Sequence, residues 1–142
     1  VLPLKIYVST YYGRRYVLAW NYIFKCFAFY RLDRIKEVCK SNECTNKNEM
    51  MMRADTAVQK LWGVSFGKEN YIEKFEMTVR IAKDEEYILK RLEREKRNGT
   101  IQKLANGDYK FTAEVYDASE MVPWIKTFTG RIVEIKCSNE RE

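Results

Sequence analysis

The sequence predicts an α+β fold made of two successive units. Residues 4–31 contain short apolar segments with no room for helices between them, which is typical of sequential antiparallel strands. Residues 49–61 have the apolar spacing of a helix. From residue 70 onward the pattern follows the order strand, helix, strand, strand, helix, strand. We therefore expect a small sheet, then a helix, then a mixed α+β unit.

The first unit is expected to be a small antiparallel sheet. Strands are predicted at residues 4–8 and 26–31, and Gly13 marks a turn after the first of them. Residues 15–24 are apolar on both faces, which predicts a strand buried on both sides or a central barrel strand. Short sequential strands of this kind indicate an antiparallel meander or a small barrel.

A helix is expected between the two units. Residues 49–61 carry its apolar positions, and Gly63 and Gly67 end it. We place a domain boundary near residues 62–69. The predicted division is 1–45 for a partial barrel, 46–69 for a helical linker and 70–142 for the second unit.

The second unit has the clearer pattern. Alternation at residues 71–81 predicts a half-buried strand, followed by a helix that Asp84 caps. Asn106 and Gly107 predict a hairpin turn, and Ser119 is expected to cap a second helix before a last strand. The side chains expected to face the core on the strand after that turn are Tyr109, Phe111, Ala113 and Val115. Such an order favours a ferredoxin-like sandwich, in which two helices cover one face of an antiparallel sheet.

The positive charge is concentrated in the first third of the chain. Of the net charge of +6, residues 1–44 contribute +5, with eight Lys and Arg against three acids. Residues 45–142 contribute +1, with eighteen against seventeen. A basic and aromatic-rich segment beside a neutral one favours an anion-binding module. A solvated basic face without a ligand is the alternative interpretation.

The Cys and His content and the apolar runs of the sequence bear on metal binding and on the cellular location of the protein. The chain has four Cys and no His, and the Cys spacing does not fit a zinc site, so we expect no metal site. No cofactor is expected. We expect reduced thiols, no membrane contact and a cytoplasmic location, because no apolar run is long enough for a membrane span and no signal-peptide pattern opens the chain. Because the first residue is Val1 and not Met, we expect a piece of a longer protein.

Two motifs of the first unit resemble the latter half of a WYL domain, a family named after a Trp-Tyr-Leu run in a barrel strand. Residues 13–20 resemble that strand, with Tyr16 matching and Arg15 in place of the Trp. Residues 30–35, Tyr-Arg-Leu-Asp-Arg-Ile, resemble the arginine-containing stretch of the next strand. The second unit resembles the extension that follows WYL domains. The resemblance implies a partial Sm-like barrel, whose first strands would precede Pro3 or come from another chain.

The resemblance also implies a binding site. The expected ligand-binding residues are Tyr16, Arg31, Arg34, Arg15 and Arg14, with Asp33 orienting an arginine. Arginines three positions apart on a flat strand point to opposite faces, so a shared phosphate clamp requires a bend or bulge near Asp33. The alternative is an internal salt bridge between Asp33 and an arginine. For Arg14 and Arg15, a solvated turn is the other interpretation.

The function implied by the resemblance is ligand sensing in a bacterial transcription regulator. Such a region binds a nucleotide or short single-stranded nucleic acid, forms a homodimer, and follows a winged helix-turn-helix domain that binds operator DNA. The alternative is a constitutive nucleic-acid-binding or dimerisation module without a small ligand. An enzyme is not expected, because the sequence lacks a nucleophile elbow, a phosphate loop and any His to activate its Cys residues.

Overall fold

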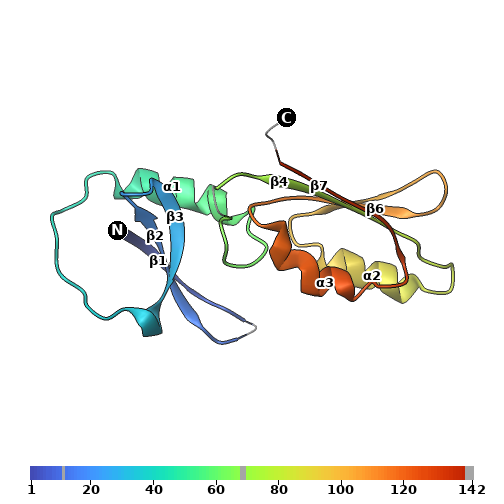
Figure 1. Ribbon diagram of the computed structural model, residues 1–142, viewed down its shortest axis with the longest axis horizontal. Coiled ribbons are helices and arrows are strands. Elements are labelled where there is room, and N and C mark those ends of the chain that lie inside the picture. The colour runs from blue at the N-terminus through green and yellow to red at the C-terminus, as the bar shows by residue number, and fades with distance from the viewer. Residues whose placement is uncertain (11, 68–69, 140–142) are drawn as a thin grey trace. The chain divides into compact units, whose positions relative to one another are not determined.

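The computed structural model describes residues 1–10, 12–67 and 70–139, and over these ranges it confirms the α+β class. The described residues form two antiparallel sheets, of three and four strands, and three α-helices (Figure 1). The chain divides into two compact units. Unit 1 comprises Val1–Gln59 and Val64–Phe66, and unit 2 comprises Lys60–Gly63 and Gly67–Glu142.

Unit 1 is built on an open antiparallel sheet in the order β1-β2-β3, which does not close into a barrel within the described residues. Its strands are β1 (Leu2–Val8), β2 (Arg15–Asn21) and β3 (Cys26–Arg31). The prediction that the second strand reaches residue 24 is wrong. The side-chain oxygen of Asn21 accepts hydrogen bonds from the backbone N–H groups of Ile23 (2.9 Å) and Phe24 (3.1 Å), and the chain turns there.

The core of unit 1 takes side chains from the sheet, from helix α1 (Lys47–Val58) and from Phe66. The buried apolar residues are Leu2, Tyr16, Leu18, Ala19, Met50, Ala54, Ala57 and Phe66. The Phe66 ring stacks on Phe29 of β3, with 5.6 Å between the ring centroids. Helix α1 is three residues shorter at its end than predicted, and it stops before the two glycines.

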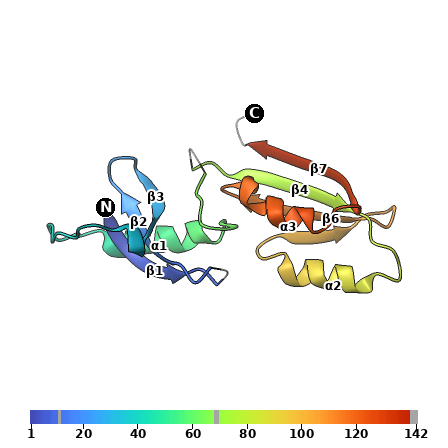
Figure 2. The same cartoon turned by 60° about the horizontal axis from the view of Figure 1, so that its bottom comes forward.

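Unit 2 is an antiparallel sheet in the order β5-β6-β4-β7 (Figure 2). Its elements in chain order are β4 (Glu73–Val79), α2 (Glu86–Glu95), β5 (Thr100–Lys103), β6 (Tyr109–Val115), the 3-10 helix η2 (Ala118–Met121), α3 (Val122–Lys126) and β7 (Ile132–Asn139). The predicted order of strands and helices is therefore present. The backbone edges of the central strands β4 and β6 are both paired, because each of these strands has a neighbouring strand on both sides.

The two helical starts differ from prediction. Helix α2 begins at Glu86, so Asp84 lies outside it, and Glu85 occupies the cap position. The carboxylate of Glu85 instead accepts hydrogen bonds from Arg131 and from the Ala82 backbone. At η2 the capping side chain is Asp117, which accepts a hydrogen bond from the backbone N–H of Ser119 at 3.1 Å. The cap thus lies one residue after the predicted position at α2 and two residues before it at η2, where Asp117 supplies the side-chain hydrogen bond.

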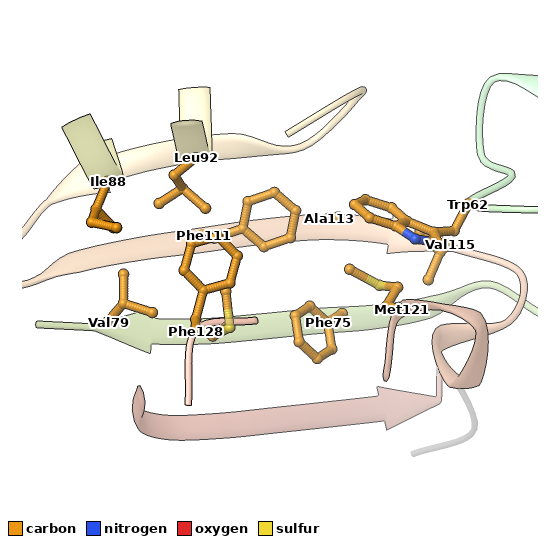
Figure 3. Close-up of a cluster of buried hydrophobic side chains, with 11 residues drawn as sticks. Trp62, Phe75, Val79, Ile88, Leu92, Phe111, Ala113, Val115, Met121 and Phe128 are labelled. Atoms are coloured by element: carbon orange, nitrogen blue, oxygen red, sulfur yellow. The ribbon is translucent and has the colours of Figure 1, made fainter. Parts of the chain in front are cut away.

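The core of unit 2 lies between its helices and one face of its sheet (Figure 3). The alternation predicted for the strand after the hairpin turn is confirmed, since Phe111, Ala113 and Val115 are buried and the turn forms at Gly107 with φ +92°. The remaining members of the cluster are Trp62, Phe75, Met77, Val79, Ile88, Leu92, Met121 and Phe128. Because one face of the sheet faces this cluster, the opposite face carries charged pairs such as Lys110 and Glu76, 2.8 Å apart.

Candidate functional site

Three arginines of unit 1, Arg14, Arg15 and Arg31, lie where β2 begins and β3 ends. The β1–β2 turn is closed by backbone hydrogen bonds between Ser9 and Arg14 and between Gly13 and Ser9, both 2.8 Å long. Gly13 has φ +63°, a conformation that glycine adopts without steric cost. In the antiparallel ladder Tyr16 lies opposite Arg31. Residues 14–15 and 31–33, which are distant in sequence, are therefore neighbours in unit 1.

A surface depression of about 510 Å³ forms at this end of the sheet. We call it the basic depression, and its lining residues are Gly13, Arg14, Arg15, Leu32 and Asp33. Arg14 and Arg15 are exposed. Three of the residues predicted for the site, Arg14, Arg15 and Asp33, thus line one concave surface.

Arg31 is engaged by Asp33. Its Nε donates a hydrogen bond to Asp33 Oδ1 at 3.0 Å, and its Nη2 donates a second to Oδ2. The hydrogen bond from Arg31 holds the pKa of the Asp33 carboxyl below its ordinary value, and the charge of Arg34 adds to this effect. A guanidinium has five N–H donors, so three donors of Arg31 are not used by this carboxylate. The ion pair is compatible with both interpretations of the site. Asp33 orients Arg31 in a phosphate clamp, and the same contact is the salt bridge of the alternative.

Arg34 stands apart from the depression. The chain leaves β3 at Arg31 and enters the 3-10 turn η1 (Leu32–Arg34), which supplies a bend at Asp33. Within the part of the chain that the structure describes, Arg34 is exposed and makes no hydrogen bond or ion pair. Its guanidinium is therefore available to an anion near the depression, although it does not line it.

Tyr16 belongs to the core of unit 1. Its side chain is buried, and its ring meets Phe29 edge-on with 6.1 Å between the centroids. An aromatic ring in this position packs on protein and offers little surface to a ligand. The exposed aromatic beside the arginines is Tyr12, which lies under the Arg14 guanidinium at 4.9 Å from the ring centroid. Sequence reasoning overlooked Tyr12, although an aromatic directly before Gly13-Arg14 was the available signal.

A second depression, of about 470 Å³, lies in unit 2 beside Arg80 and Asp108. Arg80 donates to both carboxylate oxygens of Asp108, at 3.0 and 3.1 Å, and the Asp108 side chain is 5% exposed. Asp108 directly precedes β6 in the β5–β6 hairpin, and Arg80 directly follows β4. The bidentate pair therefore holds this hairpin beside the end of β4. Arg80 is therefore bound to a buried partner, unlike Arg14 and Arg15.

The thiols and acids form no further centre in the described residues. No group of three or more Cys, Asp and Glu side chains there is placed to hold a metal ion. The four thiols are free, and Cys137 is exposed on β7, which lies at a sheet edge. None of the helices that the structure describes has the length and apolarity needed to traverse a bilayer.

Comparisons of the chain with protein-family models, with curated proteins and with solved structures find no match.

Proposed function

We propose that this chain is the ligand-sensing regulatory region of a bacterial transcription regulator, and that it binds a nucleotide or a short single-stranded nucleic acid. The observation that carries the proposal is the basic depression, where exposed Arg14 and Arg15 meet the end of β3. Guanidinium groups bind phosphate through paired N–H donors, and at this depression two of them face solvent. The role is binding and not catalysis.

The architecture supports this proposal at the level of fold. We propose that unit 1 is the remainder of an Sm-like barrel of the WYL type, since its sheet is open and its helix α1 packs beside it. We propose that unit 2 is a ferredoxin-like domain, since its sheet order β5-β6-β4-β7 combines a β-α-β-β-α-β sequence with fully antiparallel pairing. These proposals are consistent with a cytoplasmic homodimer that also carries an operator-binding helix-turn-helix domain.

The regulatory step would be a population shift. A ligand that binds one arrangement of the regulator more tightly than another biases the equilibrium by its difference in affinity. The anchoring groups we assign are Arg14 and Arg15, with Arg34 as an additional cation, and Tyr12 as a ring on which a base stacks. Asp33 orients Arg31 through their two hydrogen bonds.

The test is a titration of a labelled single-stranded oligonucleotide into wild type and the double variant Arg14→Ala/Arg15→Ala. A matched control, Lys83→Ala/Lys126→Ala, removes the same charge from unit 2. We expect roughly tenfold weaker binding for the arginine variant, since charge-assisted hydrogen bonds are lost, and no comparable loss for the control. The slope of log K against log salt is negative, and its magnitude should decrease by about 1.4 as two phosphate contacts disappear. Equal affinities of the two double variants would refute the assignment.

Two further measurements separate the alternatives. Arg31→Ala should weaken binding if its remaining donors reach the ligand, and unchanged affinity would assign Arg31 to its ion pair with Asp33 alone. Competition with free nucleotides separates a sensor from a constitutive nucleic-acid binder. A sensor site is expected to prefer particular nucleotides, whereas a constitutive binder would respond to salt without such selectivity.

A further inference from the structure

The outer edge of β7 is the longest unpaired strand edge of unit 2. β7 pairs with β4 on one side, and no described strand pairs with its other side (Figure 2). The opposite edge of the sheet is β5, which has four residues against eight in β7. An edge strand presents backbone N–H and C=O groups to any partner strand. The structure thus leaves a long hydrogen-bonding surface that the fold of unit 2 does not use.

The side chains on this edge are arranged to suit a partner. Val133 is 50% exposed and Ile135 is 45% exposed, although both are apolar. Glu134 and Lys136 flank Ile135 and form an ion pair with each other at 3.1 Å, with side chains that are 55% and 63% exposed. The edge therefore carries an apolar centre with one negative and one positive neighbour.

We propose that β7 is a dimerisation edge, and that its partner is β7 of a second copy of this chain, paired antiparallel about a two-fold axis at Ile135. In that register, residues equally far before and after Ile135 lie opposite each other. Glu134 of each copy then faces Lys136 of the other, and the two Ile135 side chains meet on the axis. The two four-stranded sheets become continuous across the interface.

Among axes at Glu134, Ile135 and Lys136, the charge pattern favours the axis at Ile135. An axis at Glu134 would place two carboxylates opposite each other, and an axis at Lys136 would place two ammonium groups opposite each other. The axis at Ile135 makes both cross-strand pairs attractive, so the chain is complementary to itself there. The proposal does not depend on the basic depression, since it uses residues of unit 2 alone, and a failed oligonucleotide titration leaves it unaffected.

The test uses charge reversal and sedimentation equilibrium of the whole chain. Wild type is expected to be a dimer. Glu134→Lys and Lys136→Glu should each dissociate about tenfold more readily, because each places like charges opposite one another twice. An equimolar mixture of the two variants should regain wild-type association, since each variant supplies the charges that the other lacks. Neither variant can regain association by itself, because residues 134 and 136 then carry the same charge in both copies.

A matched control and a covalent readout complete the test. Glu86→Lys alters an exposed ion pair with Lys90 on α2 and should leave association unchanged. In a Cys137→Ser background, Ile135→Cys should form an intermolecular disulfide on oxidation, since directly opposed residues have Cα distances that a disulfide spans. The Cys137→Ser protein alone is the control. A monomeric wild type, reversals without effect, or a mixture no more associated than its components would overturn the proposal.

Discussion

The substitution Gly99→Ala is expected to destabilise unit 2, because a methyl group at this position has no room. A Cβ on Gly99 would lie 2.2 Å from Cε2 and 2.5 Å from Cζ of Phe111. Carbon atoms in contact stay about 3.5–4.0 Å apart, so the ring has to move by roughly 1 Å or more. Phe111 is fully buried, and its ring centroid lies 5.2 Å from that of Trp124 and 6.1 Å from that of Phe75. The displacement is therefore transmitted to neighbouring rings.

The expected magnitude follows from two opposing effects of Gly99→Ala. Overpacking of a dense core costs about 1–3 kcal/mol, with the short contact distance favouring the upper end. Replacing Gly by Ala stabilises by about 0.4–1 kcal/mol through the unfolded chain. The free energy of unfolding should thus fall by about 2 kcal/mol, which lowers the melting temperature by roughly 8–16 °C in a unit of this size.

The assay is denaturation followed by tryptophan fluorescence. In a Trp20→Phe background the two remaining tryptophans, Trp62 and Trp124, both report on unit 2. A second background, Phe111→Leu, shortens the obstructing side chain, and there Gly99→Ala should cost little. The reasoning is refuted if Gly99→Ala unfolds like its parent, or if it loses the same stability in both backgrounds, since the clash is then not with Phe111.

Two further predictions concern one core residue and one ion pair. Leu18→Ala should lower the stability of unit 1 by about 2–5 kcal/mol, because Leu18 is 1% exposed, whereas Ile6→Ala, at a residue 61% exposed, should cost about 0.5 kcal/mol or less; equal losses in urea denaturation would contradict the assigned core. The hydrogen bond from Arg80 lowers the folded-state pKa of Asp108, so this pair stabilises the fold above the ordinary carboxyl pKa of about 3.9 and loses that effect as the pH falls through the lower folded pKa. The stability difference between wild type and Asp108→Asn should therefore be full near pH 7 and shrink in acid, and a difference that is constant with pH would exclude the linkage.

Much of the local structure of unit 2 can be predicted from the sequence. A strand buries alternate side chains, so the period at Phe75, Met77 and Val79 determines which face of β4 meets the core. Turn residues act equally locally, because Gly107 supplies a positive φ whatever its surroundings. These features depend on the backbone and on neighbours a few residues away, so they can be predicted from the sequence alone.

The end of β2 and the position of Tyr16 could not be predicted in this way. Residues 15–24 carry apolar side chains on both faces, and the strand ends early where the Asn21 side chain accepts hydrogen bonds from the backbone N–H groups of Ile23 and Phe24. Tyr16 reads equally well as a surface ring or a core ring, and the decision depends on Phe29 of the neighbouring strand. A partly apolar side chain takes whichever position its distant neighbours leave open.

The sequence by itself determined the α+β class, the order of the elements in unit 2 and the concentration of positive charge in the first third. Only the tertiary structure decided that Arg14 and Arg15 line a depression with Asp33, that Arg31 pairs with that same carboxylate, and that β7 lies at the edge of its sheet. The physical reason is range. Periodicity and turns arise from contacts along the chain, whereas strand order and the convergence of charges arise from pairings between segments distant in sequence.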